Sequence, residues 1–223
     1  MNYTVQKIRA AATRLGTRGL LQAGDSLSQR VAGTGQIMLL TVEIDSAHTV
    51  VLAQLHEKSD GLTYSEAHSE NPLRQHMTVY QNRKDVGAIL LNRQPWAGTL
   101  RELGQGMPGI FDEQIRHLGT RVARLEHQII TPVNCTFLRN GENAFVLENQ
   151  VLCLGMTLDR AIFNAELLEK CAKAFVLASS TGKPVGKIPW LVRWIANGRL
   201  MKDERYAAQQ HALGQVPVFK SAY

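Results

Sequence analysis

The sequence predicts an α/β domain, because segments with helical spacing of apolar residues alternate with short apolar runs typical of strands. The clearest helical spacing occupies residues 157–179, and a continuous apolar run typical of a buried strand occupies 85–91. The chain has 223 residues, of which 44% are hydrophobic and 20% charged. This length suits one globular domain, and this composition argues against disorder. We therefore expect a single domain over residues 1–223.

Charge and composition exclude several classes of protein. The sequence contains no run of about 18 apolar residues, so we expect no membrane span. Residues 1–19 alternate polar and apolar positions, which is typical of an amphipathic helix and not of a secretory signal. The net charge of +6 comes from dispersed basic residues, so nucleic acid is not an expected partner. An odd number of cysteines among apolar neighbours indicates reduced thiols in the cytoplasm: Cys135, Cys153 and Cys171.

The first half of the chain predicts a helix followed by a pair of strands. Apolar residues near helical spacing predict a helix over 4–21 that ends before Gly24. Two apolar runs, 37–42 and 49–55, flank turn-like residues and predict paired strands. The polar stretch 57–69 is expected to be a loop.

Pro72 suits the first turn of the next helix, which we expect to run to Asn82 with Ser69 as its N-cap. A long helix over 157–179 is expected to begin at the capping residue Thr157. Apolar runs closed by glycine, proline or polar residues predict the shorter elements: strand 85–91, helix 96–103, turn 106–109, strand 129–137 and a hairpin of 144–147 with 151–154.

A basic helix is expected at the C-terminal end, over about 189–202. One side of this helix is apolar and carries Trp190 and Trp194, and the other carries Arg193, Arg199 and Lys202. Such a helix suits a membrane surface. It equally suits packing against its own domain or a neighbouring subunit, where tryptophan is favoured, and we prefer this second interpretation.

Three segments resemble known sequence patterns in order and spacing: 69–83 (SENPLRQHMTVYQNR), 85–95 (DVGAILLNRQP) and 144–159 (AFVLENQVLCLGMTLD). They are similar to the class II aldolase/adducin family, whose fuculose-phosphate aldolases are metal-dependent lyases. The resemblance implies a three-layer αβα domain with a central, mostly antiparallel sheet. It also implies a homo-oligomer, with a tetramer favoured, and a role in carbohydrate metabolism.

The resemblance also implies where a catalytic metal would bind, and there the sequence departs from the family. Leu91 and Arg93 occupy the positions of the His-x-His motif, and Gln150 occupies that of the third histidine, whereas Glu70 retains the acidic position. Leucine has no donor atom, arginine repels a cation and glutamine is a poor ligand for Zn²⁺. We therefore expect no metal cofactor, unless other residues such as His68 rebuild the site.

The phosphate-binding end implied by the family is changed as well. Gly24 is followed by Asp25 where the family has an uncharged asparagine, and this carboxylate should disfavour a phosphate dianion. Ser69 retains the family's small hydroxyl residue before the acidic position. The early segment 23–28 is expected to be a loop.

Three hypotheses for function follow. The first is a degenerate family member whose cleft around Glu70, Asn92, Arg93 and Gln150 binds a small carboxylated or polyhydroxylated molecule, or in which an Arg93–Glu70 ion pair fills the former metal site. The second is an enzyme of changed chemistry, in which Glu70 is the base and Arg93 stabilises an enediolate. The third is a non-catalytic interaction domain that uses the basic C-terminal helix.

Overall fold

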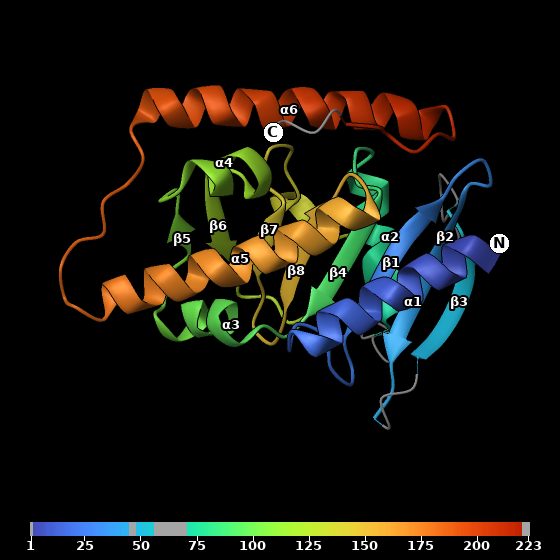
Figure 1. The fold of residues 1–223 in the computed structure, drawn as a ribbon, viewed down its shortest axis with the longest axis horizontal. Coiled ribbons are helices and arrows are strands. Elements are labelled where there is room, and N and C mark those ends of the chain that lie inside the picture. The colour runs from blue at the N-terminus through green and yellow to red at the C-terminus, as the bar shows by residue number, and fades with distance from the viewer. Residues whose placement is uncertain (1, 45–47, 56–70, 220–223) are drawn as a thin grey trace.

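The computed structural model describes residues 2–44, 48–55 and 71–219. Its centre is an eight-stranded sheet with the strand order β3-β2-β1-β4-β8-β7-β6-β5 (Figure 1). Strands β6 and β7 run parallel, and the other neighbouring strands are antiparallel. The strands are β1 (Ser26–Val31), β2 (Gln36–Val42), β3 (His48–Gln54), β4 (Ala88–Asn92), β5 (Met107–Pro108), β6 (Arg121–Arg124), β7 (Ala144–Val146) and β8 (Val151–Gly155).

Helices cover both faces of this sheet. Helices α1 (Asn2–Thr17), α3 (Pro95–Glu102) and α5 (Leu158–Ser179) lie on one face, and α2 (Pro72–Asn82) lies on the other (Figure 1). Helix α4 (Asp112–Leu118) packs between α5 and α6 (Trp190–Ala212), which runs along one edge of the molecule. The expected α/β class with a mostly antiparallel sheet between helices is therefore confirmed.

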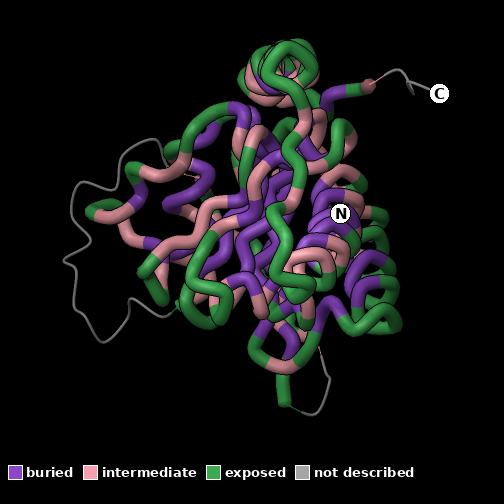
Figure 2. The backbone as a smooth tube through the Cα atoms, turned by 90° about the vertical axis from the view of Figure 1, so that its left-hand side faces the viewer, coloured by how far each residue is buried: buried purple, intermediate pink, exposed green. Residues whose placement is uncertain are grey.

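Two apolar clusters of the described residues lie on opposite sides of the sheet, and a third, small one packs Leu200 and Ala207 of α6 against Met156. Of the first two, the larger joins α1, α3 and α5 to the sheet, and the smaller packs α2 and the short 3₁₀ helix η2 (Cys135–Phe137) against the opposite face. Figure 2 shows the buried residues concentrated along the sheet and the inner sides of the helices. The three cysteines are buried and unbridged, as the sequence predicted.

Most predicted elements are confirmed, with changed ends. Helix α1 ends at Thr17, earlier than predicted, because Gly19 takes a positive φ of 68° and Leu20 N–H bonds back to the Leu15 carbonyl. Helix α6 is longer than the predicted 189–202. The N-cap of α2 is Asn71, whose side chain accepts from Leu73 N–H at 2.9 Å, and not the predicted Ser69.

Three local predictions are wrong. Residues 26–28 belong to the central strand β1 and not to a loop, and Met107 pairs with Val122 in a short strand instead of a turn. The predicted strand 129–137 is a loop followed by η2, because Pro132 has no N–H for a sheet and Asn134 closes a turn onto Thr131. The predicted turn at 45–47 and loop at 57–69 lie outside the described residues.

Candidate functional site

The register of the sheet brings most of the predicted site residues to one end of it. Strand β1 starts at Ser26 opposite Leu91, so the preceding Gly24 and Asp25 lie next to the end of β4. Asn92 at that end pairs with Val151, which follows the β7–β8 turn. The early loop, the end of β4 and this turn therefore meet in space.

A salt bridge joins the first two of these segments. Arg93 Nε donates to Asp25 Oδ1 at 3.1 Å, and the same guanidinium donates to the Ala23 carbonyl. The Asp25 side chain is fully buried and the Arg93 side chain is 45% exposed, so the guanidinium shields the carboxylate from solvent. Burial raises the pKa of Asp25, and hydrogen bonds from Gln22 N–H and Arg93 oppose that rise.

Gly24 is needed where the loop passes beneath Arg93. Its φ is 85°, a conformation that favours glycine, and a Cβ there would lie 3.2 Å from Arg93 Nη2. A side chain at this position would strain the backbone and press on the guanidinium.

Asn92 is buried and fixes its neighbour Gln94. The Asn92 amide nitrogen donates to the Leu20 carbonyl at 2.6 Å, which turns its Oδ1 toward Gln94 Nε2 at 3.4 Å. This contact orients the Gln94 amide, because an amide oxygen in place of Nε2 would face another oxygen. Gln94 is 3% exposed, and its Oε1 has no hydrogen-bond partner in the described parts of the chain.

A small cleft of about 280 Å³ opens beside Arg93. Its walls come from the end of β4, from α3 and from the β7–β8 turn, and they include the predicted residues Arg93 and Gln150. Charges of both signs line the cleft, from Arg93 and Arg101 and from Glu102 and Glu148, together with amides and one hydroxyl. The uncharged polar residues of its walls are Gln94, Thr99, Asn149 and Gln150.

The sequence of residues 26–176 matches the Class II Aldolase and Adducin N-terminal domain family. The chain belongs to this family. No protein with a curated functional description matches it.

Solved structures of this class II aldolase/adducin type share the fold at low identity. An L-fuculose 1-phosphate aldolase superposes with a TM-score of 0.70 at 19% identity, covering 87% of this chain and 94% of that one. YgbL from Escherichia coli, a putative aldolase/epimerase/decarboxylase, gives 0.65 at 18% identity, covering 86% and 96%. An aldolase II superfamily protein from Pseudomonas syringae gives 0.64 at 16% identity, covering 94% and 92%.

Two residues that the sequence resemblance places at the family's metal positions, Leu91 and Arg93, offer no donor to a metal ion. Leu91 is 1% exposed and packs in the apolar cluster beneath α2, and Arg93 brings a cation paired with Asp25. Within the described residues, no group of three histidine, cysteine, aspartate or glutamate side chains is placed to hold a metal. Hard or borderline divalent cations need such donors.

His76 is not positioned to rebuild a metal site. Its Nε2 lies 2.9 Å from Ser26 Oγ and its Nδ1 lies 2.6 Å from Ser28 Oγ, so both ring nitrogens are engaged. Burial lowers the pKa of His76 to about 3, which keeps the ring neutral.

Three residues of the sequence hypothesis lie outside the described residues: His68, Ser69 and Glu70. The Arg93–Glu70 pair and the role of Glu70 as a base therefore stay predictions. Among the described residues, the structure brings Gly24, Asp25, Arg93 and Gln150 together. Asn92 does not line the cleft, but it contacts Gln94, which does.

Sequence reasoning missed Gln94 and Arg101 as cleft residues. Gln94 follows Arg93 directly at the end of a buried strand, and that position was the available signal. Arg101 comes from α3, and its guanidinium donates to the Glu148 carbonyl in the β7–β8 turn. No pattern in the sequence of α3 or of the β7–β8 turn indicates that the two lie side by side.

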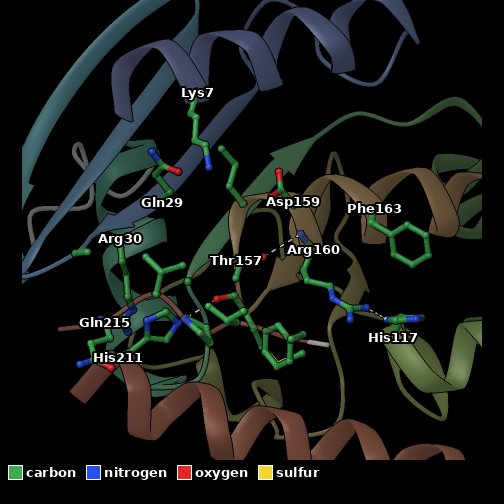
Figure 3. A pocket seen from close by; sticks show the side chains of 18 of the residues that line it. Lys7, Gln29, Arg30, His117, Thr157, Asp159, Arg160, Phe163, His211 and Gln215 are labelled. Atoms are coloured by element: carbon green, nitrogen blue, oxygen red, sulfur yellow. Dashed lines mark hydrogen bonds between the residues drawn. The ribbon is translucent and has the colours of Figure 1, made fainter. Parts of the chain in front are cut away.

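A second and larger cavity, of about 1420 Å³, lies at the opposite end of the sheet, between α1, α4, α5 and α6 (Figure 3). Two histidines there are held by neighbouring groups: His117 Nδ1 lies 2.9 Å from Arg160 Nη1, and His211 Nε2 lies 3.1 Å from the Met156 carbonyl oxygen. Burial and the nearby guanidinium groups lower the pKa of His117 to about 4. None of the predicted site residues lines this cavity.

Proposed function

We propose that the chain binds a small, neutral, polyhydroxylated molecule in the cleft beside Arg93 and that it does so without a metal ion. The observation that carries this proposal is the buried Gln94 Oε1 that has no partner within the described residues. A buried acceptor without a donor costs free energy, so a ligand hydroxyl gains affinity if the Gln94 amide turns toward the cleft and accepts from it. A hydroxyl can donate, whereas a carboxylate or phosphate dianion cannot.

The charges around the cleft favour the same ligand class. The two positive charges of Arg93 and Arg101 are matched by the two negative charges of Glu102 and Glu148. In addition, the buried Asp25 pairs with Arg93. A sugar phosphate would bring about two negative charges to a site without surplus positive charge. A sugar or polyol can instead exchange hydrogen bonds with Gln94, Thr99 and Gln150. Of the two ligand classes expected from the sequence, the polyhydroxylated one is therefore favoured.

Metal-dependent cleavage of a carbon–carbon bond is not part of this proposal. Such chemistry polarises the substrate through a Lewis acid, and the residues at the family's histidine positions provide no donor set for one. Arg93 is a weak substitute, because an arginine paired with a buried carboxylate offers less stabilisation to a developing enediolate than an uncompensated cation. The chain is thus proposed to be a catalytically inactive member of an aldolase family that has kept a ligand cleft.

Calorimetric titration in metal-free buffer tests this proposal. Neutral monosaccharides and polyols should bind, and their phosphate esters and carboxylate analogues should bind more weakly. Substitution Gln94→Leu should weaken the bound sugar by roughly tenfold, because it removes one buried acceptor, whereas Gln209→Leu on the exposed side of α6 should leave affinity unchanged. Tighter binding of the phosphate esters, or unaltered affinity in Gln94→Leu, would overturn the proposal.

A further inference from the structure

Helix α6 is firmly attached along one side only. Its buried residues are Leu200, Glu204 and Ala207, which recur at helical spacing in its second half. Glu204 lies 3.1 Å from the buried guanidinium of Arg83 and accepts from Gly141 N–H at 2.6 Å, so the helix is fixed in orientation as well as position. The opposite side of α6 is therefore held in a defined direction, away from the sheet.

The first two turns of α6 expose large apolar side chains on that outer side. Trp190 is 70% exposed and Trp194 is 71% exposed. Leu191 lies beside them and is 50% exposed, and Ile195, 44% exposed, lies where this side of the helix borders the large cavity. These four residues, which we call the outer apolar patch, recur at the i, i+4 spacing of one helix face. Exposed tryptophans grouped in this way mark an interaction surface.

Basic residues flank the outer apolar patch in the sequence, and Asp203, the first acidic residue after it, pairs with Arg116. Residues 171–202 contain six lysines and arginines and no aspartate or glutamate. Two of the basic residues, Arg199 and Lys202, are exposed on the turns of α6 that follow the patch. Lys187 is exposed just before the helix begins. The patch is thus a set of apolar side chains flanked by cations.

The position of α6 suits a flat partner. The helix runs along the extreme edge of the molecule in Figure 1, and the view in Figure 2 looks along it and shows it standing above the rest of the chain. A helix at such an edge can lie in a plane over its whole length of 23 residues without obstruction from the domain. No helix in the described residues is long and apolar enough to cross a membrane.

We propose that the outer face of α6 binds the surface of a bilayer that contains anionic lipids. Tryptophan, leucine and isoleucine would enter the headgroup region, where amphipathic helices bury their apolar side, and the flanking lysines and arginines would contact lipid phosphates. A second copy bound through the same face of both chains is a less suitable occupant. A two-fold contact through the same face sets the basic residues of both copies against each other, without acidic residues in 171–202 to pair with them.

Vesicle flotation with the full chain tests this proposal. The protein should float with vesicles of phosphatidylcholine and phosphatidylserine, should not float with phosphatidylcholine alone, and should dissociate as salt is added. The tryptophan emission should shift to shorter wavelength on binding. Trp190→Ser with Trp194→Ser should lower the bound fraction at least tenfold, and Arg199→Glu with Lys202→Glu should do the same.

Two matched variants control for general loss of apolar surface and of charge. Leu177→Ser removes an exposed apolar residue of α5 and Lys84→Glu reverses an exposed cation after α2, and both should float like the parent. Circular dichroism confirms that each variant is folded. Flotation that is equal with neutral vesicles, or unchanged in the double tryptophan variant, would overturn the proposal. So would a chain that does not float but forms dimers that the tryptophan variant abolishes, since the patch would then join copies.

Discussion

The guanidinium of Arg93 lies 3.1 Å from the buried carboxylate of Asp25, and this contact joins residues 68 positions apart in the sequence. Each of the two residues departs from what the family resemblance implies at its position, a histidine in one case and an asparagine in the other. Together they compensate each other, since an unpaired charge at either position would be costly. The pair holds the end of β4 against the loop that precedes β1.

Asp25→Asn should destabilise the chain and change its ligand preference. The substitution weakens the hydrogen bonds from Arg93 and Gln22 N–H, and about 1–2 kcal/mol of unfolding free energy should be lost, less than for a fully buried pair because Arg93 is half-exposed. Arg93 would then face the cleft as an uncompensated cation. Carboxylated ligands should bind more tightly than to the parent, as measured by calorimetry, and no gain for carboxylates would contradict the assigned pairing.

Gln94→Leu should separate ligand binding from stability. Leucine removes a buried acceptor without a partner but also the Nε2 contact to the buried Asn92 Oδ1 at 3.4 Å, so the two effects offset and the free energy of unfolding should change by less than about 1 kcal/mol. Sugar affinity should fall. Gln114→Leu is the matched control: Gln114 is buried with both amide atoms bonded, to Ile110 N–H and the Pro108 carbonyl, and its loss should cost roughly 2 kcal/mol. Urea unfolding compares the two, and equal losses would show that Gln94 is satisfied.

Glu204→Ala should loosen α6 from the domain. The change leaves Arg83 buried with Asp85 as its remaining acidic partner and removes the acceptor for Gly141 N–H. We expect a loss of about 2–4 kcal/mol, with Glu204→Gln losing less because an amide oxygen can still accept. Hydrogen exchange should rise in α6 and at Gly141 before it rises in the sheet. Unchanged protection of α6 would show that its apolar contacts suffice.

The sequence predicted the segments in which the pattern of apolar and capping residues alone indicates burial and element type. Strands β4 and β8 are buried on both faces and read as continuous apolar runs, and α5 carries a capping threonine and a regular apolar stripe. Strand β1 was missed because one of its faces bears Ser26 and Ser28. These hydroxyls look like loop residues until His76 of α2 is placed against them. Burial of that polar face depends on a helix about 50 residues away.

The candidate site was predicted in its parts but not in its contacts. The sequence predicted a cleft around Glu70, Asn92, Arg93 and Gln150. In the described residues Arg93 and Gln150 line one cleft, and Gly24 and Asp25 lie next to Arg93. The resemblance located these residues, but it did not indicate which side chain pairs with which, because that depends on strand register. The assigned role of Gln94 depends on a chain of hydrogen bonds from Leu20 through Asn92, and no local pattern encodes it.

As the pH falls from 6.5 to 5, His76 should lower stability, whereas Glu204, whose pKa burial raises to about 7, should raise it in the same range. The His76 contribution is therefore measured as the difference between the parent and a His76 variant. Burial lowers the pKa of His76 from 6.5 to about 3, so this side chain takes up a proton in this range in the unfolded chain and not in the folded one. By linkage, the His76 contribution to the free energy of unfolding decreases as pH falls below 6.5, by up to roughly 5 kcal/mol near pH 3. His76→Gln should remove this contribution. A dependence of stability on pH should remain in the variant, because the pKa of His117 is also lowered, to about 4, and that of Glu204 is raised. Identical slopes would mean that His76 is not buried.

Elemental analysis of protein purified without chelator or affinity tag should find far less than one zinc, manganese or iron per chain. The reason is the donor set: Leu91 lies in the core, Arg93 is bound to Asp25, and both nitrogens of His76 are engaged by serines. A chelator should accordingly leave the thermal midpoint unchanged, because no bound ion would contribute to folding. One tightly held ion per chain, with a lower midpoint after its removal, would mean that ligands outside the described residues rebuild the site. Metal-dependent chemistry would then return as the leading function, and Glu70→Gln, assayed for both metal content and sugar binding, would show whether the family's acidic position takes part.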